Sequence, residues 1–411
     1  MAKIRPFRAT RPTRDKANLV ASRSYLSYSN ASLKEKLDNN PYTFLHIINP
    51  EYNSENKKTG IDKFNLVKNK FSDFIKDGTL FQEKENSLYI YQQTTQNTIF
   101  SGIIAATSVD DYLNGNIKIH EQTITKREEM FKNYLKTTGF NAEPVLLTYK
   151  DNNTIENIIS ETIKKRSEYE FTTTNKVGHK LWKIESKEDT NRIISEFKGI
   201  ENIYIADGHH RSASSSLLCK NIRKENPNYQ PEDSFNFFMS YLIPESQLKI
   251  INFNRLIKHT NGLTSYELIA KIEESFIVIK KGSIPYSPSL KDEISMYLRG
   301  TWYSLVLLPK KEMQDCVSKL DPAILSNNIL APILDITDEK TDNNIIFESG
   351  NTPLSIIKNK IDSGEYAVAF ILKPITILAL KEVADNNLSM PPKSTYIEPK
   401  LRSGLTIYPL E

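Results

Sequence analysis

One stretch near the middle of the chain has residue types that suit phosphate chemistry. A run of apolar residues ends there in an acid, a glycine, two histidines and an arginine: Asp207, Gly208, His209, His210 and Arg211. This change predicts a strand that turns through glycine into a helix, whose first backbone N–H groups attract anions. Arg211 can hold phosphate oxygens through its fork of donors, and Asp207 can hold Mg²⁺. We therefore expect a phosphate site at this turn.

Two plainer interpretations of this stretch compete with the phosphate site. The stretch could be a structural turn in which Asp207 caps the helix and the histidines are exposed. A zinc site built from His209 and His210 is disfavoured, because adjacent residues rarely face one metal and no Cys or His partner has ligand spacing. Consecutive histidines between Asp and Arg are uncommon in a plain turn, which favours the phosphate site.

A second candidate lies in Lys118–Thr123, just before a segment with the apolar spacing of a helix, residues 126–137. It contains His120, Glu121 and Thr123. Glu121 could act as the general base on a bound hydroxyl group. It could also be a helix-start carboxylate that the helix dipole stabilises, and the pattern alone favours that role.

The third candidate is the C-terminal stretch Met390–Gly404, where cations and hydroxyl groups alternate with prolines that restrict the backbone. The side chains that could clamp phosphate oxygens are Lys393, Ser394, Thr395, Lys400 and Arg402. An ordinary solvated loop is an equally good interpretation. His46, His179 and His259 are isolated along the chain, so we expect each to be a satisfied core or surface residue.

Strands and helices must position these residues. Strands are expected at 43–48, 87–92, 98–108, 144–149, 180–184, 202–206, 235–243 and 302–308, and helices at 64–77, 126–137, 212–220 and 265–276. Gly139 is expected to end the second helix. Strands and helices do not alternate strictly, which indicates an α+β (mixed α/β) fold. We expect a lobe over 1–230 with the catalytic core and a second lobe over 231–411 with the phosphate-clamp tail.

The composition is that of a globular protein and excludes several classes. Among 411 residues, 39% are hydrophobic and 25% charged, and the net charge of +4 is too small to favour nucleic-acid binding. No apolar run is long enough to cross a bilayer. The basic N-terminus lacks the apolar stretch of a signal peptide, and two cysteines cannot staple the chain, so we expect a cytoplasmic protein. The sequence leaves a monomer and a homodimer open.

No Walker loop, dinucleotide fingerprint or kinase Gly-rich loop occurs, so a phosphate site must be of another type. Three stretches together resemble the domain-of-unknown-function 1015 family: residues 118–123 with the following helix, 204–211 and 390–404. The order of Glu121, a helix, Gly139, a strand and the turn at 207–211 is also similar to that in ParB/sulfiredoxin-like free-serine kinases. This resemblance implies a ParB/sulfiredoxin-like catalytic core with additional strands and helices. The longer span between 149 and 207 predicts an inserted element that loops out.

The resemblance also implies an activity, namely phosphoryl transfer to the hydroxyl of free L-serine to give O-phosphoserine. Glu121 would then be the base, and Asp207 would hold Mg²⁺ on the phosphates of ATP, ADP or pyrophosphate. Residues implied to bind phosphate or substrate are His120, Thr123, Gly208, His209, His210, Arg211, Lys393, Ser394, Thr395, Lys400 and Arg402. The alternative is a ParB-like nucleotide-binding switch that associates with DNA or a protein partner. A phosphatase that uses the same pocket is a third candidate.

Overall fold

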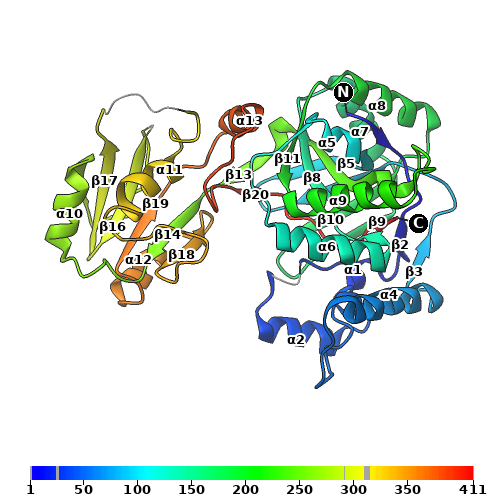
Figure 1. Ribbon diagram of the computed structural model, residues 1–411, viewed down its shortest axis with the longest axis horizontal. Helices are drawn as coiled ribbons and strands as arrows, with labels where there is room; N and C mark the ends of the chain where they lie inside the picture. Colours follow the sequence, from blue (N-terminus) through cyan, green and yellow to red (C-terminus); the bar gives the residue numbers. More distant parts are fainter. Residues whose placement is uncertain (1, 25–26, 291, 310–314, 411) are drawn as a thin grey trace. The chain divides into compact units, whose positions relative to one another are not determined.

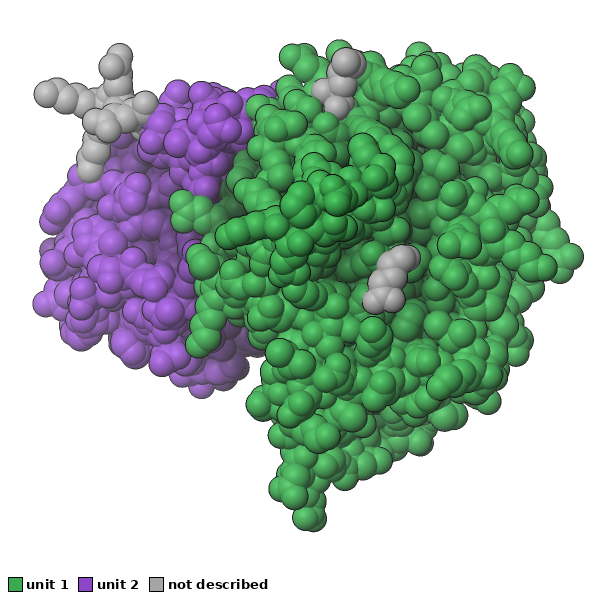
Figure 2. Space-filling view, turned by 45° about the vertical axis from the view of Figure 1, so that its right-hand side comes forward, with its two compact units in different colours: residues 1–248, 399–411 green, residues 249–398 purple. Residues whose placement is uncertain are grey.

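The computed structural model describes residues 2–24, 27–290, 292–309 and 315–410, and the chain divides into two compact units (Figure 2). Unit 1 comprises residues 1–248 and 399–411, and unit 2 comprises residues 249–398. This division differs from the lobes over 1–230 and 231–411 that the sequence led us to expect. The segment after residue 230 stays with unit 1 because β12 (Phe237–Pro244) lies inside its central sheet, and the tail returns to unit 1 at residue 399.

Within the described residues, unit 1 is built on a nine-stranded sheet of order β6-β11-β8-β12-β5-β4-β10-β9, with β1 paired to β5 (Figure 1). Besides β12, its strands are β1 (Ile4–Arg5), β4 (Tyr89–Thr94), β5 (Ile99–Ser108), β6 (Ile117–Lys118), β8 (Val145–Tyr149), β9 (Tyr169–Thr172), β10 (Gly178–Lys183) and β11 (Ile203–Asp207). Two small ribbons pair β2 (Thr10–Pro12) with β3 (Leu80–Gln82) and β7 (Phe140–Asn141) with β21 (Tyr408–Pro409). Parallel and antiparallel pairs mix in the central sheet.

The helices of unit 1 pack on this sheet and on one another. They are α1 (Ala17–Val20), α2 (Asn30–Asn39), α3 (Leu45–Ile48), α4 (Gly60–Lys76), α5 (Val109–Leu113), α6 (Thr125–Thr138), α7 (Asn153–Ile163), α8 (Lys187–Gly199) and α9 (His209–Glu225). Helices α6 and α9 lie side by side (Figure 1). Apolar residues of α7 and α8, such as Ile159 and Phe197, share a core with Ile90, Ile103 and Trp182 of the sheet.

The opposite face of the sheet carries Tyr91 and Tyr241, and the C-terminal segment lies near it. The Thr406 hydroxyl contacts the Met239 sulfur on this face, and the Ile407 amide donates to the carbonyl of Thr10. The tail is therefore an integral part of unit 1.

Most expected elements are present, and the α+β class is confirmed. Gly139 ends α6 in the left-handed region at φ 76°, as expected. The strand expected at 43–48 was wrong: Leu45–Ile48 forms α3, because a short buried apolar run fits a strand or a helix equally well. The expectation that the span after residue 149 loops out was also wrong, since its strands β9 and β10 extend the central sheet.

Unit 2 contains, within its described residues, a six-stranded antiparallel sheet of order β15-β17-β16-β19-β14-β18. Its strands are β14 (Phe253–Ile257), β15 (Phe276–Gly282), β16 (Glu293–Leu298), β17 (Thr301–Leu307), β18 (Ile345–Ser349) and β19 (Val368–Ile371). Its helices are α10 (Ser265–Glu273), α11 (Asp321–Leu325), α12 (Leu354–Asp362) and α13 (Ile377–Asp385). Strands β13 (Lys249–Ile251) and β20 (Tyr396–Glu398) pair where the chain enters and leaves the unit.

In the part of the chain that the structure describes, every helix is too short or too polar to span a bilayer.

Gly102 of β5 tests how tightly the central sheet packs. A Cβ atom at this position would lie 2.4 Å from the carbonyl oxygen of Leu242 and 2.8 Å from the Tyr241 ring. We expect Gly102→Ala to lower the free energy of unfolding by about 1–3 kcal/mol in urea titrations, because overpacking forces neighbours to shift. Gly178→Ala is the matched control, since its Cβ would find its nearest neighbour at 3.5 Å. Equal losses for the two variants would contradict this account.

Candidate active site at the start of helix α9

The predicted strand-to-helix turn is present and depends on Gly208. Strand β11 ends at Asp207, and α9 begins at His209. Gly208 between them has φ 107°, where an L side chain is strained. A Cβ atom there would also lie 3.0 Å from Nε of Arg211. The glycine thus lets the guanidinium lie against the backbone at the helix start, where N–H groups and the helix dipole favour an anion.

The pairing of β6 with β11 brings the second candidate stretch to this turn. The two strands are parallel, with Ile117 opposite Ile203 and Lys118 opposite Tyr204. Parallel strands end at the same edge of a sheet, so the residues that follow each strand emerge together. His120 and Glu121 therefore lie beside the residues that follow Tyr204.

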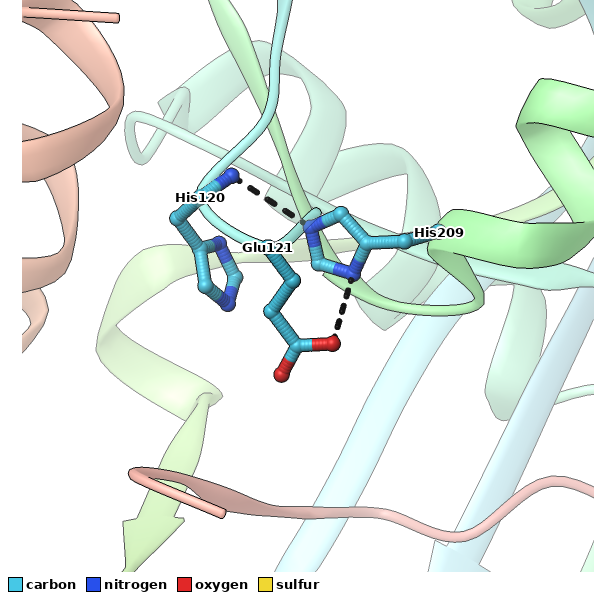
Figure 3. A group of neighbouring side chains, drawn as sticks. All are labelled: His120, Glu121 and His209. Atoms are coloured by element: carbon cyan, nitrogen blue, oxygen red, sulfur yellow. Dashed lines mark hydrogen bonds and ion pairs between the residues drawn. The ribbon is translucent and has the colours of Figure 1, made fainter. Parts of the chain in front are cut away.

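His209 is the residue of the turn that Glu121 contacts. Its Nδ1 lies 3.4 Å from Oε2 of Glu121, and its Nε2 lies 3.4 Å from the backbone nitrogen of His120 (Figure 3). A backbone N–H can only donate, so Nε2 accepts and the neutral ring carries its proton on Nδ1, directed at Glu121. The His209 side chain is 4% exposed and that of Glu121 is 48% exposed. A buried imidazole thus orients a carboxylate that solvent can reach.

Burial keeps both histidines of this group neutral. Burial lowers the pKa of His209 well below its usual value, and His120, His210 and Arg211 lower it further. The pKa of His120 falls to about 4 through burial, against the charge of Asp207. The two rings meet edge to face, with centroids 4.5 Å apart. Within the described residues, neither ring nitrogen of His120 has a hydrogen-bond partner.

His120, Glu121 and His209 could together hold a metal ion. Among the described residues, one donor atom from each lies within 4.8 Å of the other two. Two imidazoles and a carboxylate suit Zn²⁺ or Mn²⁺ better than Mg²⁺, which prefers oxygen ligands. The fit is incomplete, because ligation through Nδ1 of His209 requires its proton to move to Nε2 and the contact with the His120 amide to break.

Asp207 lies between two cations. Its Oδ2 is 3.2 Å from Nζ of Lys400 and 3.7 Å from Nη2 of Arg211. Burial alone would raise the pKa of the Asp207 carboxyl. Lys400, Arg211 and a hydrogen bond from the backbone of Gly208 outweigh this effect, so the pKa is lowered. Asp207 is therefore ionised at neutral pH. Its charge is already compensated, which leaves it less suited to hold a metal ion alone.

Arg211 is also held by Glu143, which the sequence did not single out. Its Nη1 lies 2.7 Å from the Glu143 carboxylate and donates to the carbonyl of Pro144 at 2.5 Å. Glu143 precedes β8, the sheet neighbour of β11. No motif marks it, because only strand pairing brings it to the turn.

The remaining predicted residues are divided between the two units. Lys400 and Arg402 belong to unit 1, whereas Lys393, Ser394 and Thr395 belong to unit 2, so these five residues do not form one clamp within a single unit. Lys393 lies over the Phe253 ring, the Ser394 hydroxyl donates to the carbonyl of Pro391, and Thr395 is half-buried. The Thr123 hydroxyl donates to the Glu128 carboxylate, next to the start of α6. His210, in the first turn of α9, is half-buried and its carbonyl accepts from the Ser214 hydroxyl.

Lys400→Met tests the charge balance at Asp207. A depressed pKa stabilises the fold above the carboxyl's unfolded pKa, and this contribution is lost as pH falls through the folded pKa. We expect the variant to raise the Asp207 pKa, measured by carboxyl NMR. The free energy of unfolding should fall by less than about 1 kcal/mol at pH 7, because both groups are partly exposed. Lys132→Met on α6 is the control, and it should leave the Asp207 pKa unchanged.

Solved structures with some likeness to this chain include a free serine kinase in complex with AMP, at 13% identity and TM-score 0.34 over 74% of this chain and 91% of that chain. C-terminally truncated SbnI from Staphylococcus aureus matches at 13% identity and TM-score 0.38, over 75% and 87%. TM-scores this low support neither a site nor an activity. No curated protein matches the chain. The model of the family described as "Protein of unknown function (DUF1015)" matches residues 4–323, and the chain belongs to this family.

Proposed function

We propose that unit 1 is a phosphotransferase whose acceptor is an alcohol, namely the hydroxyl group of free L-serine. The observation that carries this proposal is the contact between the accessible Glu121 carboxylate and the buried, neutral His209 at the start of α9. A base lies there beside a site that favours anions. The choice of serine rests on the resemblance of the motif order to free-serine kinases.

In the proposed reaction, Glu121 accepts the proton of the serine hydroxyl while the serine oxygen forms a bond to phosphorus. The bond between phosphorus and the leaving phosphate oxygen breaks, and the electron pair remains with the leaving group. The Nδ1–H of His209 holds the carboxylate of Glu121 in one orientation. Such transfer depends mainly on positioning and on stabilising charge.

The helix start and its cations would stabilise the transferring group. The backbone N–H groups in the first turn of α9 and the guanidinium of Arg211 would stabilise negative charge on the transferring phosphoryl group. Lys400 adds a second cation. Mg²⁺, when bound with the donor phosphates, would neutralise part of their charge, with Asp207 among the residues that hold it. The donor is ATP, ADP or pyrophosphate, because each presents a phosphoanhydride bond to such a site.

Glu121→Gln tests the proposal directly. Wild-type protein, serine and Mg²⁺ are incubated with each donor in turn, and O-phosphoserine is quantified by mass spectrometry. The variant removes the carboxylate proposed as the base but keeps the shape of the side chain. Product formation should therefore fall by about 10²–10⁴-fold with little change in thermal stability. Glu129→Gln, on the exposed side of α6, is the control and should retain activity.

Three results would count against the proposal. Wild-type protein that forms no phosphoserine with any donor would remove it. Full activity in Glu121→Gln would exclude Glu121 as the base. Release of phosphate from O-phosphoserine without any donor would show a phosphatase in place of a kinase.

A further inference from the structure

Arg402 is a buried cation of unit 1. The residue is only 8% exposed to solvent. Its Nη2 reaches Oγ1 of Thr173 at 3.5 Å and Oδ1 of Asn175 at 3.4 Å, which are long, weak contacts. Within the described residues, no Asp or Glu forms an ion pair with it. A buried, uncompensated guanidinium is unfavourable and therefore needs an explanation.

Two further donors are buried on the neighbouring strands. His179 of β10 and Gln93 of β4 lie directly opposite each other in the sheet and are 1% and 3% exposed. In the part of the chain that the structure describes, neither the Nε2 of His179 nor the amide nitrogen of Gln93 has a hydrogen-bond partner. The Tyr91 hydroxyl lies 2.7 Å from Nδ1 of His179. A phenol is the stronger donor of the two, so the neutral ring carries its proton on Nε2.

The three groups share one space. Directly opposed residues of antiparallel strands lie on the same face of a sheet, and Thr173, which Arg402 contacts, lies in the turn between β9 and β10. Burial and, to a smaller extent, the Arg402 charge lower the pKa of His179 to about 3. Burial raises the pKa of the Tyr91 phenol, while the Arg402 charge opposes that rise. The charge of Arg402 thus acts on both the histidine and the tyrosine, and its guanidinium contacts the turn that precedes β10.

We propose that Arg402, His179 and Gln93 form a binding site for an oxyanion, the carboxylate or phosphate group of a small ligand. All three offer N–H donors, and the guanidinium fork matches the oxygens of either group. A bound anion would satisfy the unpaired donors and neutralise the buried charge. Arg23 adds a further positive charge that acts on Arg402. The site does not depend on the phosphoryl transfer proposed above.

Histidine NMR can observe this site separately from the turn at 207–211. The chain has six histidines, so a long-range ¹⁵N–¹H spectrum of their rings is simple, and His179→Gln assigns the His179 signals. Phosphate and acetate are titrated in separate samples, with sodium chloride at matched ionic strength as reference. We expect the His179 signals to shift with phosphate or acetate and not with chloride. The anion that binds more tightly identifies the ligand group, and signals of His209 and His210 report independently on the other site.

Arg402→Gln should weaken this binding at least about tenfold, because it removes the charged fork. Lys176→Gln, which removes an exposed charge from the same β9–β10 turn, is the matched control and should bind as wild type does. Without anion, Arg402→Gln should melt no lower than wild type, whereas a purely structural role for Arg402 predicts a loss. His179 signals that respond to neither anion in wild type would overturn the proposal, even if Arg402→Gln did not fold.

Discussion

The parallel pairing of β6 with β11 is the constraint on which the candidate active site depends. Only two residues of β6, Ile117 and Lys118, make this pairing, yet it sets where the following segment emerges. Without it, Glu121 would have no reason to meet His209, which lies 88 positions later in the chain. Because the end of β11 and the start of α9 are fixed by Gly208, the carboxylate, the imidazole and the helix N-terminus meet in one place.

Burial and neighbouring charges give these side chains different properties. The buried imidazole of His209 is neutral and can only orient its neighbour, whereas Glu121 is accessible enough to meet a substrate. Asp207 stays ionised because Lys400 and Arg211 compensate its burial. The site therefore places an accessible carboxylate close to two cations and a helix N-terminus, and the proposed phosphoryl transfer depends on this arrangement.

The segment between β8 and β11 and the C-terminal tail both contribute to the sheet face that carries Tyr91 and Tyr241. The β9–β10 hairpin of that segment extends the sheet through β4 and places His179 opposite Gln93. The tail then brings Lys400 to Asp207 and, two residues later, Arg402 to the hairpin. A single extended stretch thus links the turn at the start of α9 to the buried donors on β4 and β10.

Local features were predictable from the sequence, because they depend on neighbouring residues. Apolar periodicity, Gly139 and Gly208 determine where α6 stops and where β11 turns into α9. The α+β class followed in the same way, whereas the short apolar run of α3 was ambiguous. Only the tertiary structure decided which distant groups meet, including Glu143 with Arg211, because strand order and burial are set by packing of the whole unit. Among the described residues, the same packing leaves Nε2 of His179 without a hydrogen-bond partner, which no spacing along the chain could reveal.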